Sequence, residues 1–316
     1  MFQNYLLLMK RRLLFFCLVL GWGGHSRAQS LENSVFWEIT SPHHPQPSYL
    51  FGTHHLHSYQ FIEKNPNLLQ ALEASRVIVG EMVIDSTHLA AVYLKLAMAM
   101  MMPPSQSLDK LLTPEQYQAT DQCLRDNIGM GIAIFNNVKP IFLYQLIMVA
   151  KYMKTQNQEA LPSALENPLG NSMDGFFQQF GKTNGREVLG LETVDDQLKA
   201  LYDGYSLPRQ VEMLMQMVND QAGGSSEELV SMTEMYRQQD LNALQALMER
   251  NTQPEEIQSL LIDRNQQWIP KLHNWLQTSS SLFIAVGAGH LPGPYGLIAQ
   301  LRQKGYVLKP LSIQIQ

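Results

Sequence analysis

Five of the nine histidines lie between positions 43 and 57, and three of them stand in the segment GTHHLH at residues 52–57. The apolar run at residues 49–51 precedes this segment, so Gly52 lies at the end of an expected strand. Glycine there lets the backbone turn tightly or lets a ligand approach closely. If the segment stays extended, His55 and His57 share one face and His54 takes the other. Neutral imidazole is a good ligand for zinc, manganese, cobalt or iron, so one interpretation is a metal site and the alternative is a set of hydrogen-bonded structural histidines.

A second unit near the other end of the chain repeats the same pattern. Residues 285–291 (AVGAGHL) match residues 50–56 (LFGTHHL) as an apolar strand followed by G-x-x-H-L. Gly287 and Gly289 surround His290 with small residues, which keeps bulky side chains away and leaves backbone N–H groups free. The two units could meet side by side in one sheet. The alternative is an ordinary strand-to-helix turn with a capping histidine.

Two carboxylates end apolar runs. Glu81 follows residues 77–80 and shares parity with Val77 and Val79, so it points into the same layer as a buried strand. A carboxylate there needs a metal, a histidine or an arginine as its partner. As a general base it would deprotonate a metal-bound water, and the alternative role is a structural ion pair. Glu192 ends residues 188–191 in the same way, although electrostatics at the start of the next helix explains it better.

Arg264 falls on the apolar stripe of an expected helix. It lies seven residues after Ile257 and four before Trp268, so its guanidinium faces inward. Such a group requires a carboxylate or an oxyanion. The functional interpretation is transition-state stabilisation or substrate anchoring, and the alternative is an ion pair with Glu81 or Glu192.

The remaining features exclude several function classes. The 316 residues are 45% apolar and 16% charged, which is a globular composition, and the formal charge of −5 leaves no basic excess for nucleic acid. The sequence contains no Walker loop, GxSxG elbow, HExxH motif or CxxC pair. Gly287 and Gly289 also lack the spacing of a dinucleotide-binding loop.

The elements that position these residues follow an α/β pattern. Strands are expected at both ends of the chain and helices in the middle, which predicts a mixed central sheet from the N- and C-terminal regions, with a large helical insertion at about residues 88–170. Open α/β sheets bind ligands at the carboxyl edge of their strands. We expect a break or kink at Pro254 and at Pro270. The expected strands are residues 35–39, 49–51, 77–79, 188–191, 282–286 and 306–308, and the expected helices are residues 67–75, 88–102, a helix capped by Thr113, 141–152, 174–180, 194–202, 208–219, 226–277 and 296–303.

The first 28 residues resemble a signal peptide rather than part of the fold. Three basic residues at positions 10–12 precede the apolar run 13–20 and the small-x-small sequence at residues 26–28. Either Met1 or Met9 is the start, and a membrane anchor is the alternative. Removal takes away four basic residues and no acid, so the charge of −5 becomes −9 for residues 29–316. We therefore expect a periplasmic or secreted protein without stable membrane insertion, and with Cys123 as its one cysteine.

Taken together, these motifs resemble the TraB/GumN/PrgY family, which includes the TIKI proteins. The resemblance runs from about Val35 to Leu308. It implies an α/β fold with a helical insert and an activity like that of the TIKI branch, a metal-dependent peptidase using manganese or cobalt. The essential groups there are two GxxH histidines and a glutamate. The matching segments are residues 50–55, Glu81, residues 191–193, Arg264 with Asn265 and Trp268, and residues 286–293 with 296–297.

The resulting hypothesis is an exported metal-dependent hydrolase acting on a peptide or another small substrate. His55, His290 and Glu81 hold a divalent metal, manganese or cobalt, with zinc and iron as alternatives. Glu81 or a metal-bound hydroxide attacks a carbonyl carbon, and Arg264 stabilises the negative charge. His54, His57 and Glu192 are supporting groups or alternative ligands. The competing hypotheses are a non-catalytic metal- or haem-binding protein and a metal-independent, esterase-like hydrolase that uses histidine and glutamate as acid and base.

Overall fold

The computed structural model describes residues 32–41, 44–83, 89–156, 172–220, 224–278 and 281–315, so the expected signal peptide at residues 1–28, with its alternative starts, lies outside the described residues. The described ranges belong to one compact unit, Glu32–Gln316. They contain a six-stranded sheet, and each strand coincides with an expected one. The strands are β1 (Phe36–Ser41), β2 (His44–Thr53), β3 (Val77–Gly80), β4 (Glu187–Gly190), β5 (Leu282–Gly287) and β6 (Val307–Pro310).

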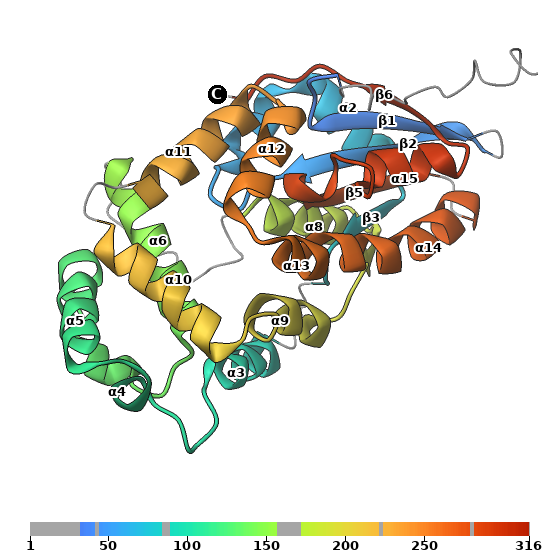
Figure 1. Ribbon diagram of the computed structural model, residues 1–316. Helices are drawn as coiled ribbons and strands as arrows, with labels where there is room; N and C mark the ends of the chain where they lie inside the picture. Colours follow the sequence, from blue (N-terminus) through green and yellow to red (C-terminus); the bar gives the residue numbers. More distant parts are fainter. Residues whose placement is uncertain are drawn as a thin grey trace, which may run out of the picture. The chain divides into compact units, whose positions relative to one another are not determined.

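The sheet joins the two ends of the chain, as expected. Its order is β4-β3-β5-β2-β1-β6, and Figure 1 shows the N-terminal strands (blue) beside the C-terminal ones (red). Strands β2, β5, β3 and β4 run parallel, whereas β1 is antiparallel to β2 and to β6. The carboxyl ends of the four parallel strands therefore share one edge. The fold class, α/β with a mixed central sheet and a helical insertion, is confirmed.

Strand β2 begins earlier than expected, at His44 rather than Tyr49. The added part contains Pro45 and Pro47, which are unusual within a strand because proline cannot donate to the ladder. The structure tolerates them because β5 pairs with β2 only from Tyr49 onward, so the earlier residues have one partner, β1.

Helices lie on both faces of the sheet. On one face, Phe177 of α8 packs 5.2 Å from Phe51 and 4.9 Å from Phe283, measured between ring centroids. On the other face, Arg302 of α15 lies over the Trp37 ring of β1. The α-helices are α2 (Pro66–Ala74), α3 (Leu89–Met100), α4 (Leu108–Leu111), α5 (Pro114–Ile128), α6 (Pro140–Thr155), α8 (Met173–Thr183), α9 (Val194–Tyr202), α10 (Leu207–Asn219), α11 (Gly224–Arg237), α12 (Leu241–Asn251), α13 (Pro254–Ile257), α14 (Asp263–Thr278) and α15 (Leu297–Gln303), joined by the 3-10 turns η1 (Tyr59–Lys64), η3 (Ile132–Phe135) and η5 (Ala288–His290) and the π-helical η4 (Gln258–Ile262).

The long helical stretch after residue 226 breaks differently from the expectation. Gln239, with φ of 57°, separates α11 from α12, and no proline marks that position. Pro254 occupies the first turn of α13, where its missing N–H is not needed. Pro270 lies inside α14, so the helix does not break there, and of the two expected outcomes only a kink is left. Water can satisfy the carbonyl that Pro270 leaves without a donor, because Gln266 is exposed.

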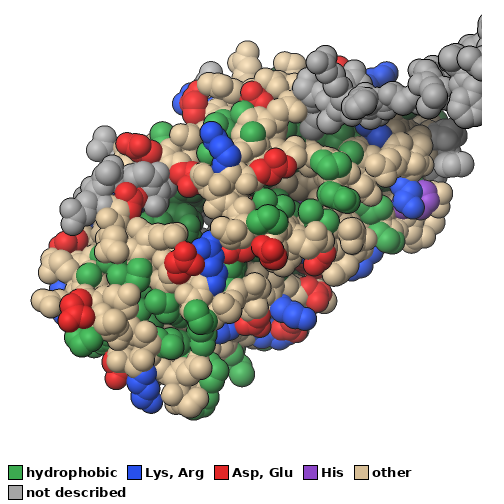
Figure 2. All heavy atoms as spheres, viewed as in Figure 1, with side chains coloured by type: hydrophobic (Ala, Val, Ile, Leu, Met, Phe, Trp, Pro, Cys, Tyr) green, Lys and Arg blue, Asp and Glu red, His purple; other side chains and the backbone are tan. Residues whose placement is uncertain are grey.

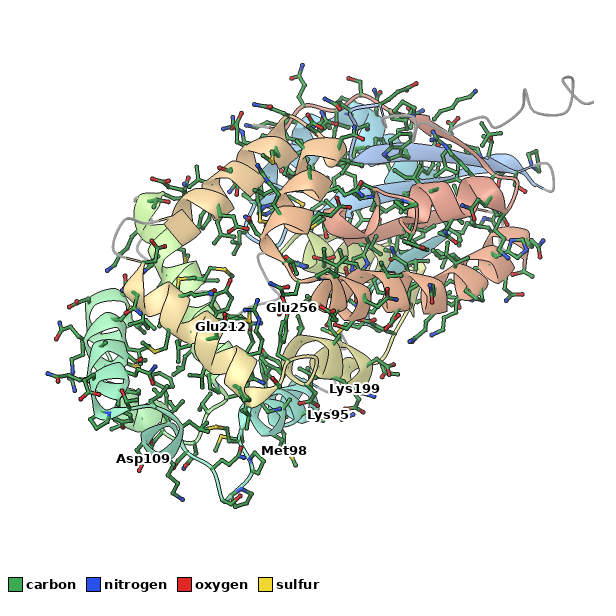
Figure 3. The ribbon with its side chains drawn as sticks, viewed as in Figure 1. Lys95, Met98, Asp109, Lys199, Glu212 and Glu256 are labelled. Atoms are coloured by element: carbon green, nitrogen blue, oxygen red, sulfur yellow. The ribbon has the colours of Figure 1, made fainter. Side chains whose placement is uncertain are left out.

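The helices of the expected insertion, at about residues 88–170, share a hydrophobic core with a helix from outside that range. Helices α4, α5 and α6 pack against α10, which follows β4 in the chain. Arg209 of α10 connects this cluster to α13, because its guanidinium lies 2.7 Å from Glu256 and 2.9 Å from Glu212. Figure 3 shows these two carboxylates facing each other from α13 and α10. The fully buried members of the core are Leu108, Leu124, Leu143, Ile147, Ala150 and Leu214.

The surface carries mixed charge. On the face drawn in Figure 2, lysine and arginine side chains are interspersed with aspartate and glutamate. This pattern gives no reason to revise the expectation about nucleic acid, which stays a prediction. Among the described residues, we find no helix with the length and hydrophobicity needed to cross a membrane.

Candidate functional site

The two GxxH units meet at the carboxyl edge of the sheet. Strands β2 and β5 are parallel neighbours, with Gly52 opposite Val286 and Thr53 opposite Gly287. The approach is close, because a Cβ built on Gly52 would lie 3.1 Å from both Cα and Cβ of Ala288. Glycine at position 52 therefore allows the second unit to turn directly against the first.

Gly287 lies at the centre of the candidate site. A Cβ built on it would be 3.2 Å from Glu81 Oε1, 3.6 Å from His290 Cδ2 and 4.0 Å from His55 Nε2. A single small volume thus borders all three residues that the sequence selected as metal ligands. We call His55, Glu81 and His290 the edge cluster. Their catalytic and ligand roles stay predictions.

His290 is buried and is held as a neutral ring. Its side chain is 4% exposed, and the ring lies 4.4 Å from Trp268 between centroids. Arg264 Nη1 lies 3.1 Å from Nε2, and because a guanidinium can only donate, Nε2 accepts. The proton is then on Nδ1, which donates to Asn265 Oδ1 at 2.8 Å. Burial lowers the pKa of His290 to about 3, so the ring is neutral at physiological pH.

His55 is exposed and pairs with an acid that the sequence analysis did not select. Its Nδ1 lies 3.2 Å from Asp174 Oδ2, and Thr53 donates to the other carboxylate oxygen at 3.2 Å. The Asp174 carboxylate raises the pKa of His55 to about 9. His55 is therefore protonated at neutral pH in the absence of a metal.

The other two histidines of the segment point away from the edge cluster. The His57 N–H donates to the His54 carbonyl at 3.1 Å, so the chain turns after Thr53 and is not extended. The rings of His54 and His57 both pack against Tyr236, at 5.1 and 5.8 Å between centroids. The condition under which His55 and His57 would share a face, an extended segment, is therefore not met.

Glu81 is an ionised carboxylate held from several sides. Its Oε1 accepts from the Gly287 N–H at 2.8 Å, and its Oε2 accepts from Arg264 Nη2 at 2.7 Å and from Gln197 at 3.0 Å. Burial opposes ionisation, but the Arg264 guanidinium, the protonated His55 ring and the Gly287 N–H outweigh it and hold the pKa of Glu81 at about 2. His290 Nε2 lies 3.8 Å from Oε1.

Arg264 links both carboxylates. Its Nη2 lies 2.7 Å from Glu81 and 2.7 Å from Glu192, and its Nη1 donates to the Leu260 carbonyl at 3.0 Å. Glu192 also accepts from Trp268 Nε1 at 3.2 Å. Burial raises the pKa of Glu192, although the Arg264 pair opposes that shift. The ion pairs considered as alternatives for Glu81 and Arg264 are thus present, and they connect directly to the edge cluster.

Two residues at the site escaped the sequence analysis. Asp174, in the first turn of α8, looked like an ordinary acid near a helix N-terminus, where acids are common. Gln197 of α9 carries no signal in the sequence, because a single amide on a helix is unremarkable. Both reach the site only through tertiary packing, which brings Asp174 against His55 and Gln197 against Glu81.

The donor set suits a metal, although the described side chains do not form a closed ligand shell. Within the described ranges, no group of three histidine, cysteine or carboxylate side chains is arranged to hold a metal ion. However, Nδ1 of His55 faces Asp174 and Nδ1 of His290 donates to Asn265. Metal-binding histidines are oriented by partners of this kind. The competing contact is Arg264 Nη1, which uses the Nε2 lone pair of His290.

Replacing Asp174 with asparagine should return His55 toward the ordinary histidine range. Removing the carboxylate removes the interaction that raises the pKa of His55 to about 9. Titration followed by imidazole NMR signals should show the His55 midpoint fall by about two units, toward 6.5. His54 and His290 serve as internal controls, because burial lowers their pKa values to about 4 and about 3 and neither should titrate between pH 5 and 10. An unchanged His55 midpoint would contradict the assigned pair.

Comparisons with known proteins agree with the resemblance read from the motifs. A family model described as the TraB/PrgY/gumN family matches residues 35–310. Among curated proteins, the metalloprotease TIKI2 of Danio rerio is 24% identical over 323 aligned residues, which cover 87% of this chain and 60% of the relative. The chain thus spans about 60% of the length of that relative. No solved structure matches the chain.

Proposed function

The chain belongs to the TraB/PrgY/gumN family, and from that premise we propose that it is a metal-dependent hydrolase whose substrate is a peptide or a similar small carbonyl compound. The observation that carries the proposal is the edge cluster itself. His55, Glu81 and His290 come from three segments of the chain and border one small volume at Gly287. A distant relative is named a metalloprotease, and that activity is extended to this chain only as part of the proposal.

The proposed ligands are His55, His290 and Glu81, with manganese or cobalt as the preferred metal. Bound there, the metal would supply Lewis-acid activation of water and of a carbonyl group. His55 must lose its proton before it can bind, since only neutral imidazole is a ligand. His290 is already neutral, so it needs no proton loss but must exchange its contact with Arg264.

The electrostatics favour one of the two roles considered for Glu81. A general base works best with a pKa near the working pH, and a pKa of about 2 makes Glu81 a weak proton acceptor. The same low pKa keeps the carboxylate ionised, as a metal ligand must be. We therefore assign Glu81 as a ligand rather than as the proton acceptor, and Arg264 as the group that stabilises developing negative charge.

Metal content is the direct test. The purified protein should bind about one manganese or cobalt ion per chain, and replacing His55 and His290 together with alanine should lower the metal affinity by at least about 100-fold. His57→Ala is the matched control, because it removes a histidine of the same segment that packs against Tyr236 instead. Equal metal content in the double variant and the parent would contradict the ligand assignment. Loss of metal in His57→Ala would mean that His57, and not His55 alone, belongs to the metal site.

A specific contact favours a second candidate function, a metal-independent hydrolase. Arg264 Nη1 occupies the His290 nitrogen that a metal would need, and the Arg264–Glu81 pair is complete without an ion. Activity that survives a strong chelator would support this candidate. Retained ligand binding without turnover, or a haem Soret band, would instead support a non-catalytic binding protein. Export to the periplasm or beyond stays a proposal that rests on residues 1–28.

A further inference from the structure

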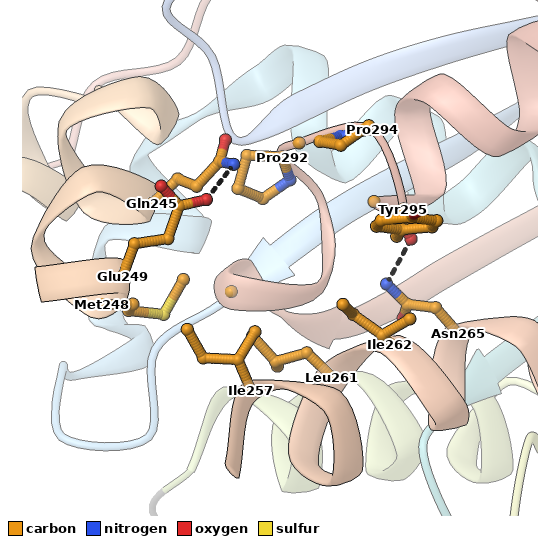
Figure 4. Close-up of a pocket in the computed structure, with 13 residues that line it drawn as sticks. Gln245, Met248, Glu249, Ile257, Leu261, Ile262, Asn265, Pro292, Pro294 and Tyr295 are labelled. Carbon is orange, nitrogen blue, oxygen red and sulfur yellow. Dashed lines mark hydrogen bonds between the residues drawn. The ribbon is translucent and has the colours of Figure 1, made fainter. Parts of the chain in front are cut away.

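An apolar pocket is lined by Gly289 and Asn265, which are the chain neighbour and the hydrogen-bond partner of His290 in the edge cluster. Its volume is about 200 Å³, and four of its lining side chains (Met248, Ile257, Leu261 and Ile262) are apolar and only half-buried. Figure 4 shows Met248 and Gln245 on the α12 side of the pocket and Tyr295 on the opposite side. An engineered apolar cavity of about 150 Å³ binds benzene, so this pocket has room for one branched or aromatic side chain.

Gly289 keeps the floor of the pocket open. A Cβ built there would lie 3.2 Å from Met248 Sδ and 3.8 Å from Leu261 Cδ2. Gly287, two residues earlier, opens instead onto the edge cluster. The short turn η5, which contains His290, therefore lies between the charged edge cluster and the apolar pocket.

Two structural features, Asn265 and the π-helical η4, contact both the pocket and the edge cluster. Asn265 lines the pocket, accepts from His290 Nδ1 and donates to the carbonyls of His290 at 3.1 Å and Tyr295 at 3.0 Å. The π-helical η4 supplies Leu261 and Ile262 to the pocket, and its Leu260 carbonyl accepts from Arg264. Short π-helical segments occur frequently at functional sites. A displacement of Asn265 or of η4 would therefore change the pocket and the edge cluster together.

We propose that this pocket is a specificity subsite that takes one large apolar side chain of the substrate, next to the bond that is cleaved. The inference rests on the proposed hydrolase function and names a substrate class for it, a peptide with leucine-like or phenylalanine-like character at one position. Gly289 of the pocket directly precedes His290 of the cluster, and successive Cα atoms of a peptide are about 3.8 Å apart, so the proposal places the carbonyl at the cluster and the side chain in the pocket within one or two residues of each other. Glu249, which accepts from Gln245 at 2.7 Å at the pocket edge, disfavours an acidic side chain there.

The first test measures binding and does not depend on turnover. The full-length chain carries ¹³C-methyl methionine, with the Met248 signal assigned from Met248→Leu, and is titrated separately with the N-acetyl amides of leucine, phenylalanine and aspartate. The leucine and phenylalanine amides should shift the Met248 signal saturably, whereas the aspartate amide should not. Ile262→Trp should abolish the shift by filling the pocket, and Ile134→Trp, the same change at a 71% exposed site, should leave it intact. No saturable shift, or an equal response to aspartate, overturns the proposal.

A second variant keeps the proposal testable if Ile262→Trp does not fold. Gly289→Ala adds one methyl against the flexible end of Met248 and should weaken binding without disturbing the fold. The kinetic arm uses a peptide library varied at one position, where the parent should prefer leucine or phenylalanine over aspartate by at least about tenfold, and Gly289→Ala should shift the preference toward alanine. Binding without turnover contradicts the hydrolase proposal and supports the pocket. Turnover with no preference contradicts the pocket alone.

Discussion

Replacing Arg264 with methionine should lower the free energy of unfolding by about 3–5 kcal/mol, the largest stability change expected at any single position of the site. Arg264 is the cation between two carboxylates, and the side chains of Glu81 and Glu192 are 8% and 4% exposed. Without the guanidinium, two buried negative charges face each other with no compensating cation. Methionine keeps the length and apolar stem of arginine, so lost packing contributes little. Urea unfolding at pH 7 measures the change.

The pH dependence gives this prediction a second readout. A carboxylate whose pKa is depressed by folding contributes stability above its unfolded pKa of about 4.5, and loses it as pH falls toward about 2. Loss of Arg264 raises the folded pKa of Glu81, so the acid unfolding midpoint should move to higher pH. Arg125→Met is the control, because Arg125 forms an exposed pair with Asp121 on one helix and should cost no more than about 0.5 kcal/mol. Equal losses in the two variants would show that the Arg264 network is not a buried one.

The part of the site that could be predicted from the sequence is the part fixed by strand ends. Parallel strands bring their carboxyl ends to one edge, so two GxxH units and an acid that follow three such strands must come close together. The apolar runs before Gly52, Glu81 and Gly287 are short and strongly buried, which makes their strands easy to recognise. At these three positions the apolar sequence pattern predicts a strand, and the structure has one.

The part that could not be predicted depends on side chains that arrive from helices. Asp174 reaches the site because α8 packs on the sheet, and Gln197 reaches it from α9, which packs against α3 and η4. Nothing in the neighbouring residues of either distinguishes it from a surface group. The partners of His54 and His57 were missed for a related reason, since the turn after Thr53 is closed by a backbone hydrogen bond that has no sequence marker. The contact of α10 with α5 and α6 was missed because α10 follows β4, whereas the other helices of that core precede it in the chain.

The arrangement also explains why two acids with the same sequence context differ. Glu81 and Glu192 both follow a parallel strand, and both pair with Arg264 at 2.7 Å. Glu81 extends toward Gly287, because β3 is the direct neighbour of β5. Glu192 follows the edge strand β4 one position farther away and reaches Trp268 instead. Strand order therefore assigns Glu81 to the edge cluster and Glu192 to the support of Arg264.

Glu81→Gln should reduce kcat/KM by at least about 100-fold on the peptide that the parent turns over fastest, the largest activity loss expected from a change of similar shape. The amide cannot supply the negative charge that the proposed metal requires, and metal affinity should fall in parallel. The fold should survive, because Glu192 still pairs with Arg264 and the amide oxygen can still accept from the Gly287 N–H. Kinetics, metal titration and thermal unfolding on the same preparation measure the three effects.

Glu192→Gln is the matched control, since it breaks an ion pair of the same length to the same guanidinium. It should lower kcat/KM by less than about tenfold, because Glu192 touches Trp268 and Arg264 and not the volume at Gly287. The pH profile separates the two roles of Glu81. With a pKa of about 2, a ligand carboxylate produces no acid limb above pH 4, whereas a proton acceptor would produce one that disappears in Glu81→Gln. Such a limb would return Glu81 to the general-base role, and equal losses in the two variants would mean that the carboxylates act only by holding Arg264 in place.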